Sequence, residues 1–129
     1  MMILFKIYKF EAGIIIINEI LEETKPDLID EVKLRDGAYE IIHKALKGVV
    51  DNATGRGAKV KGIAVYGKTG TAQNPHGDDH GWFLAFAGQE NAEPEIAVSV
   101  LVQFGKGGGA QAAPVARKVI ESYFYGDKN

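Results

Sequence analysis

Three runs of apolar, β-branched and aromatic residues in the second half of the chain place the tightest constraint on its fold. They cover residues 60–73, 82–87 and 96–104, and short connections rich in glycine and polar residues separate them. Runs of this length between turn residues are typical of β-strands. The second and third runs are apolar almost without interruption, which indicates a sheet covered on both faces. We therefore expect residues 62–73, 81–88 and 95–104 to form adjacent antiparallel strands in that order.

Two further segments have the apolar spacing of amphipathic helices. They are residues 36–51, with Ala38, Ile41, Ile42, Ala45, Leu46, Val49 and Val50, and residues 110–123, with Val115, Val119, Ile120 and Tyr123. Each apolar stripe needs an apolar partner, so we expect one helix on each face of the sheet. The predicted fold class is α+β, an antiparallel sheet with helices on both faces.

The N-terminal third is less regular. Residues 3–9 and 14–20 are rich in β-forming residues, and Glu11-Ala12-Gly13 between them suits a hairpin turn. Residues 21–35 are polar, contain Pro26, and are typical of a connector. We therefore interpret residues 1–129 as a single partial domain, with an N-terminal hairpin and connector over 1–35 and a main body over 36–124.

Composition excludes several classes of function. A formal net charge of −2 argues against nucleic-acid binding, and the absence of cysteine excludes disulfide and thiol chemistry. Charged residues at positions 6, 9, 11 and 19 interrupt the apolar N-terminus. A membrane span needs about 20 nearly uninterrupted apolar residues, so we expect neither a signal peptide nor an anchor in this chain.

The stretch that carries chemistry is Tyr66-Gly67-Lys68-Thr69-Gly70-Thr71-Ala72-Gln73, and two interpretations compete for it. Residues 62–69 match the phosphate-loop pattern G-x-x-x-x-G-K-[ST] letter for letter. A phosphate loop needs a helix that begins at the Lys-Thr pair. The residues before Lys68 favour a strand instead, and the glycine, asparagine and proline after Thr69 disfavour a helix. A nucleotide-binding function therefore stays a minor alternative.

The second interpretation is the Lys-Thr-Gly motif of penicillin-recognising serine enzymes, which lies on a strand beside the active site. In that motif Lys68 supplies a fixed cation, and the hydroxyls of Thr69 and Thr71 can hold a substrate carboxylate. Gly70 has no side chain, so a substrate can approach the backbone closely. Three residues alone are equally compatible with an ordinary edge strand that contains a glycine bulge.

The surrounding sequence favours the second interpretation. Residues 65–77 and 79–87 resemble the third-motif strand, turn and next strand of penicillin-binding transpeptidases, closest to elongation-type penicillin-binding protein 2. The loop Ala53-Thr54-Gly55, the glycines 107–109 and residues 112–117 also resemble segments of that family. The resemblance is specific from about residue 36 to residue 124.

The resemblance implies a partial penicillin-binding transpeptidase (serine β-lactamase-like) fold. It also implies a D,D-transpeptidase that joins peptidoglycan stem peptides through an acyl-serine, which β-lactams trap, at the periplasmic face of the cell membrane. Lys68 would be the motif lysine, Thr69, Gly70 and Thr71 would bind substrate, and the backbone N–H of Thr71 would be an oxyanion donor. Such a donor contributes a few kcal/mol in the transition state. No metal or cofactor is expected.

The chain departs from the family pattern in its serines. Ser99 and Ser122 are its only two, and neither lies in a Ser-x-x-Lys or Ser-x-Asn motif. We therefore expect a C-terminal fragment that is inactive alone, with a noncatalytic binding or assembly module as the alternative.

In the family, further strands pair beyond the strand that matches residues 95–104. We expect the hairpin at residues 3–20 to cover that edge, within one chain or in a homodimer.

Four other features have less specific interpretations. His76, Asp78, Asp79 and His80 could ligate a metal, but a polar turn is favoured. His43 is interpreted as a helix-surface residue. Residues 105–109 could bind an anion before a helix, but a flexible connection is favoured. Trp82, Phe83 and Phe86 are expected in the core.

Overall fold

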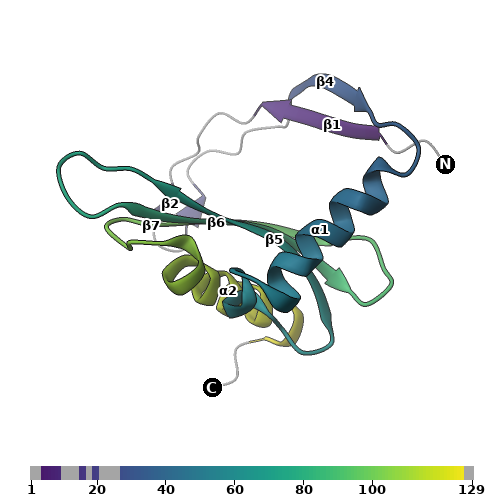
Figure 1. The fold of residues 1–129 in the computed structure, drawn as a ribbon. Coiled ribbons are helices and arrows are strands. Elements are labelled where there is room, and N and C mark those ends of the chain that lie inside the picture. Colours follow the sequence, from purple (N-terminus) through teal and green to yellow (C-terminus); the bar gives the residue numbers. More distant parts are fainter. Residues whose placement is uncertain (1–3, 10–14, 17–18, 21–26, 127–129) are drawn as a thin grey trace. The chain divides into compact units, whose positions relative to one another are not determined.

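A computed structural model describes residues 4–9, 15–16, 19–20 and 27–126 (Figure 1). The chain divides into two compact units, residues 1–41 and residues 42–129. Within the described residues, no helix is both long enough and apolar enough to cross a lipid bilayer.

In the first unit, β1 (Leu4–Lys9) pairs antiparallel with β4 (Asp27–Lys33), and β2 (Ile15–Ile16) pairs with β3 (Glu19–Ile20). The predicted hairpin between residues 3–9 and 14–20 is therefore wrong, and the predicted connector over 21–35 contains a strand. The register places Lys6 opposite Glu31 and Lys9 opposite Asp27. The predicted turn at Glu11-Ala12-Gly13 lies outside the described residues.

The helix α1 (Ala38–Asn52) follows Gly37, whose φ of 80° is in the region that glycine favours. A short 3₁₀ turn, η1 (Arg56–Ala58), follows α1. The backbone N–H groups of Ala53 and Gly55 both donate to Val49 O, at 3.3 and 2.9 Å. These bonds satisfy the last turn of α1 and fix the direction in which the chain leaves the helix.

The second unit contains a three-stranded antiparallel sheet of β5 (Ile63–Ala72), β6 (His80–Gln89) and β7 (Ile96–Val102), in that spatial order. The strand positions, their order and their antiparallel pairing confirm the prediction. The register runs without a shift from Ile63 opposite Gln89 to Ala72 opposite His80. Within the described part of the chain, β5 and β7 each have a strand partner on one side only. The predicted cover of the outer edge of β7 by residues 3–20 within one chain is not found among the described residues, where β7 pairs with β6 alone.

The helix α2 (Ala113–Tyr125) runs along one face of the sheet (Figure 1). Alternate residues of β6 and β7 face it and are buried, among them Phe83, Ala85, Ala87 and Val100. Ile120 and Ala116 of α2 are fully buried against them. Because successive side chains of a strand point to opposite faces, every second residue of β6 and β7 faces α2. Burial of these apolar side chains is the main stabilisation of the sheet.

The opposite face of the sheet is covered in part by α1. The ring of His43 lies 4.7 Å from the ring of Tyr66 and 5.2 Å from that of Phe86, and those two aromatic rings stack on each other at 4.9 Å. His43 is therefore a packing residue rather than a surface residue. Trp82 lies on this face and is 36% exposed, so its predicted core position is wrong, whereas Phe83 is fully buried. Helices on both faces confirm the predicted fold class.

Candidate functional site

The residues Lys68, Thr69, Gly70 and Thr71 lie in the second half of β5, on the strand at the edge of the sheet. Gly67, just before this segment, allows β5 to lie close to the core. A Cβ there would lie 2.5 Å from Cζ of the buried Phe83 ring, so only glycine allows the strand to pass over that ring. Lys68 and Thr71 are exposed, and Thr69 and Gly70 are half-buried. The motif therefore presents its side chains and backbone at an open edge.

A glycine-rich turn packs against this part of the sheet. Residues Gly108–Ala112 form a single π-helical turn that leads into α2. A Cβ on Gly108 would overlap Trp82 O and lie 2.7 Å from Gly70 O, and a Cβ on Gly109 would overlap Thr54 O. The turn can lie this close to the two strands only because these positions lack side chains.

Together these segments line a shallow cleft of about 640 Å³. Its lining residues are Thr54, Lys68, Thr69, Gly70, Thr71, Gly107, Gly108, Gly109 and Ala110. The structure thus brings together all four of the predicted site residues. Residues 105–109 were predicted to be a flexible connection, and the structure places glycines 107–109 of this segment in the wall of the cleft.

Two hydrogen bonds order the polar groups in the cleft. The Lys68 Nζ donates to Thr69 O at 2.6 Å. The hydroxyls of Thr54 and Thr69 lie 2.9 Å apart and share one hydrogen bond. Sequence reasoning assigned no role to Thr54, although the loop Ala53-Thr54-Gly55 resembles a family segment, because its contact with a residue fifteen positions later is visible only in the fold.

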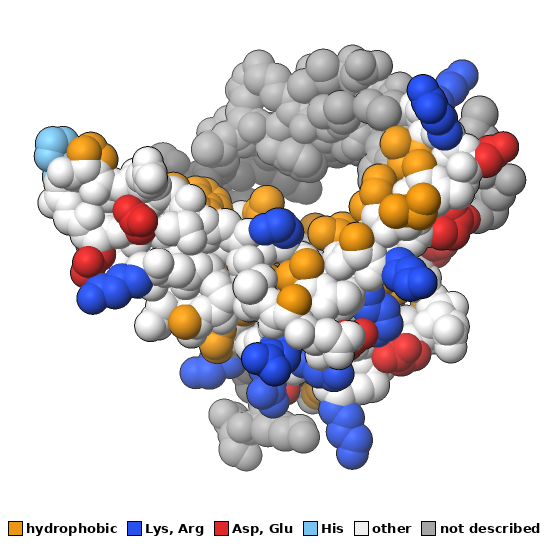
Figure 2. Space-filling view, in the orientation of Figure 1, with side chains coloured by type: hydrophobic (Ala, Val, Ile, Leu, Met, Phe, Trp, Pro, Cys, Tyr) orange, Lys and Arg blue, Asp and Glu red, His pale blue; other side chains and the backbone are white. Residues whose placement is uncertain are grey.

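The turn after β5 and the loop after β7 hold each other at one end of the cleft. The N–H of Phe104 donates to His80 Nδ1 at 3.0 Å, and the N–H of Lys106 donates to Asp79 O at 2.9 Å. Lys106 Nζ lies 3.6 Å from Asp78 Oδ2, and Figure 2 shows charged side chains of both signs gathered at this end of the molecule. Of the four residues considered above as metal ligands, the side chains of Asp78 and His80 and the backbone carbonyl of Asp79 thus join the two loops.

The phosphate-loop interpretation fails on geometry. Gly62 has a φ of 77° and ends a turn, and residues 63–72 continue as one extended strand. The chain then turns into β6 rather than into a helix beginning at Lys68. An extended strand cannot wrap its N–H groups around a phosphate as that motif requires.

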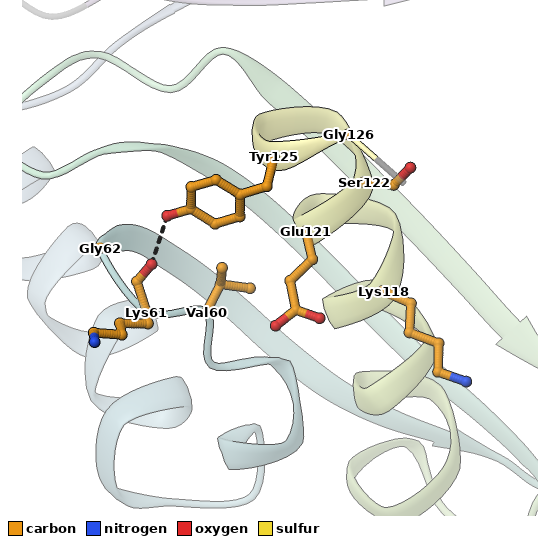
Figure 3. A pocket seen from close by; sticks show the side chains of 8 residues that line it. All are labelled: Val60, Lys61, Gly62, Lys118, Glu121, Ser122, Tyr125 and Gly126. Carbon is orange, nitrogen blue, oxygen red and sulfur yellow. Dashed lines mark hydrogen bonds between the residues drawn. The ribbon is translucent and has the colours of Figure 1, made fainter. Parts of the chain in front are cut away.

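A second cavity lies at the other end of β5 (Figure 3). Its volume is about 760 Å³, and Val60, Gly62, Glu121 and Tyr125 are among its lining residues. The Tyr125 hydroxyl donates to Lys61 O at 2.6 Å across it, which fastens the end of α2 to the start of β5. Figure 3 shows the side chains of Lys61 and Lys118 extending away from this cavity.

The serines of the chain lie away from the cleft. Ser99 is exposed on β7, on the face opposite α2, and Ser122 is exposed on α2. Neither lines the cleft formed by Thr54, residues 68–71 and the glycine turn. Ser99 lines, together with Lys68 and Leu46, a separate and mainly apolar cavity. The cleft therefore offers a cation, hydroxyls and a strand edge, which suit the binding of a carboxylate.

Comparison with known proteins identifies the family. Residues 6–121, most of the chain, match the family described as Penicillin binding protein transpeptidase domain. The Haemophilus influenzae protein named peptidoglycan D,D-transpeptidase MrdA is 36% identical over 104 residues, which is 67% of this chain and 16% of that protein. Penicillin-binding protein 3 of Bacillus subtilis is 34% identical over 71% of this chain and 15% of its own length.

Solved structures agree with the sequence comparison. The crystal structure of Pseudomonas aeruginosa PBP2 superposes with a TM-score of 0.66 at 32% identity, over 80% of this chain and 22% of that one. Penicillin-binding protein A from Mycobacterium tuberculosis, solved as its imipenem acyl-enzyme, superposes with a TM-score of 0.55 at 31% identity, over 75% and 22% of the two chains. The chain thus spans about a sixth of the curated relatives' length. It belongs to the penicillin-binding protein transpeptidase domain family.

Proposed function

We propose that the Lys68–Thr71 segment is the substrate-binding wall of a peptidoglycan D,D-transpeptidase that acts outside the cytoplasmic membrane. The whole protein would cross-link stem peptides through an acyl-serine supplied by residues other than those of this chain. The observation that carries the proposal is the convergence of Lys68, Thr69, Gly70 and Thr71 with the glycine turn on one open cleft.

The chemistry of the cleft supports this assignment. The Lys68 ammonium and the hydroxyls of Thr69 and Thr71 can together hold the terminal carboxylate of a stem peptide or of a β-lactam. The backbone N–H of Thr71 would donate to the oxyanion that forms on acylation. A donor placed in advance for charge that develops only in the transition state is worth a few kcal/mol.

The names of the relatives support the choice of substrate. The Haemophilus influenzae relative is named a peptidoglycan D,D-transpeptidase, and the Mycobacterium tuberculosis structure is an imipenem acyl-enzyme. We extend the named transpeptidase activity and the reaction with a β-lactam to the whole protein that contains this chain. Its substrates would be stem peptides, and β-lactams would inhibit it.

A direct test maps carboxylate binding on the 129-residue chain. We expect N-acetyl-D-alanyl-D-alanine to shift backbone amide NMR signals in residues 68–71 and 107–110, and to do so more strongly than its C-terminal amide. Lys68→Ala should abolish this preference, whereas Lys118→Ala, an exposed lysine at the other cavity, should leave it unchanged. Shifts confined to other surfaces, or equal responses to acid and amide, would contradict the proposed site.

A second test concerns chemistry rather than binding. We expect no covalent adduct between the 129-residue chain and a fluorescent penicillin, because neither Ser99 nor Ser122 lies at the cleft or in a nucleophile motif. The readout is a fluorescent band after denaturing electrophoresis. A stoichiometric band would show that this chain carries its own nucleophile.

We also propose that the isolated chain forms a homodimer through the outer edge of β7. Among the described residues that edge has no strand partner. An edge of this kind presents unpaired N–H and C=O groups that can pair with a second chain.

A further inference from the structure

We propose that Thr54 is a positioning residue for carboxylate binding, and that it acts by donating its hydroxyl proton to Thr69. The inference rests on the proposed function, because it concerns the same cleft. Its basis is the 2.9 Å contact between the two hydroxyl oxygens.

The structure holds Thr54 in place from two sides. On one side, the N–H of Gly55 donates to Val49 O at 2.9 Å, and a Cβ on Gly55 would lie 3.2 Å from the buried Phe83 ring. On the other side, Gly109 lies so close to Thr54 O that a Cβ there would overlap it. Thr54 itself is exposed and lines the cleft. A hydroxyl fixed through its backbone in this way can orient a neighbour.

The direction of this hydrogen bond decides what Thr69 offers to a ligand. A threonine hydroxyl has one proton and two lone pairs. If Thr69 donates to Thr54, it turns only lone pairs towards an incoming carboxylate and repels it. If Thr54 donates to Thr69, the Thr69 proton is free to point at the carboxylate.

A bound anion therefore favours the second direction. The chain of bonds then runs from the Thr54 hydroxyl to the Thr69 oxygen and from the Thr69 hydroxyl to the carboxylate. Each bond in such a chain polarises the next, which strengthens the last one. The Lys68 ammonium donates to Thr69 O, lines the same cleft and favours the same anion.

Substitution of Thr54 tests the inference by ligand selectivity rather than by affinity alone. The measured quantity is the ratio of dissociation constants for N-acetyl-D-alanyl-D-alanine and its C-terminal amide, from NMR titration of the 129-residue chain. Thr54→Val keeps the shape of the side chain and removes the donor, and we expect it to reduce carboxylate preference about fivefold. Thr54→Ser keeps the hydroxyl and should retain the preference.

Two comparisons make the outcome decisive. Ser122→Ala removes an exposed hydroxyl on α2, at the cavity that Tyr125 lines, and should leave the preference unchanged. Thr54→Ala also removes the donor and serves as a second variant in case valine disturbs the loop. A general loss of structure would weaken acid and amide alike, without changing their ratio. An unchanged ratio in both Thr54→Val and Thr54→Ala would overturn the role of Thr54. A wild-type chain without carboxylate preference would instead overturn the proposed function on which that role depends.

Discussion

At the scale of single residues, the cleft depends on glycines whose importance only the folded structure reveals. Gly108 and Gly107 are neighbours in a run of three glycines, yet their surroundings differ completely. A Cβ on Gly108 would overlap the backbone of β6, whereas a Cβ on Gly107 would meet nothing within 4 Å. Gly107 also has a φ of −178°, which any residue can adopt.

This difference gives a matched pair of substitutions. We expect Gly108→Ala to lower the free energy of unfolding by about 1–3 kcal/mol, because backbone atoms must move to admit the methyl group. Gly107→Ala should change it by less than about 0.5 kcal/mol. Urea unfolding followed by circular dichroism measures both. Equal effects of the two substitutions would mean that the turn does not pack against β5 and β6 as described.

The carboxylate of Asp51 is the second residue whose surroundings predict a measurable effect. Burial raises its pKa, but Lys59 Nζ at 3.2 Å and Lys47 Nζ at 3.4 Å outweigh burial, so the pKa falls below the ordinary 3.8. A lowered pKa in the folded state stabilises the fold above the ordinary pKa, and this contribution is lost as pH falls through the folded pKa.

We therefore expect Asp51→Asn to destabilise the fold at neutral pH by at most about 1 kcal/mol, since the ion pairs are partly exposed. The difference in unfolding free energy between the wild-type chain and Asp51→Asn should shrink at pH values well below 3.8, where Asp51 is protonated in the folded and the unfolded state. Urea midpoints at several pH values measure it, with the exposed Glu93→Gln as control. A difference that grows on acidification would reverse the expected sign.

At the scale of elements, β6 shows how one strand divides its residues between two environments. Phe83 faces α2 and is fully buried, whereas Leu84, the next residue, lies on the other face and is 54% exposed. We expect Phe83→Ala to cost about 3–5 kcal/mol because it removes a ring from the centre of the core. Leu84→Ala should cost less than about 0.5 kcal/mol. Similar unfolding midpoints for the two variants would contradict the assigned faces.

The elements also show which parts of the fold the sequence can predict. The strands β5, β6 and β7 are apolar runs between turn residues, so their positions and order follow from local pattern alone. The strand β4 carries three acidic residues in seven and shows no alternation, and its extended form depends on pairing with β1. No local pattern encodes a partner eighteen or more residues away. The contact between Thr54 and Thr69 was missed for the same reason.

At the scale of the whole molecule, the described chain offers two sheet edges with different surroundings. The outer edge of β5 borders the cleft, where the glycine turn lies close by. The outer edge of β7 has no strand partner among the described residues. We propose an extended substrate for the first edge and a second copy of the chain for the second.

The proposed homodimer is tested by light scattering on chromatographed protein. We expect the mass of two chains at high concentration and a fall towards one chain on dilution. Hydrogen exchange should show β7 amides that are slower to exchange in the associated form. A mass of one chain at every concentration, with β7 amides exchanging freely, would exclude association through this edge.

The length of β6 places the cleft and the turn around Asn91 at opposite ends of the sheet. One end of the strand meets the glycine turn, where Gly81 lies against Gly107 O, and the other end leads into the turn around Asn91. Ten residues at about 3.3 Å each place roughly 30 Å between these ends. A fluorophore or short peptide tag introduced at residues 90–92 would therefore report on the molecule without entering the cleft.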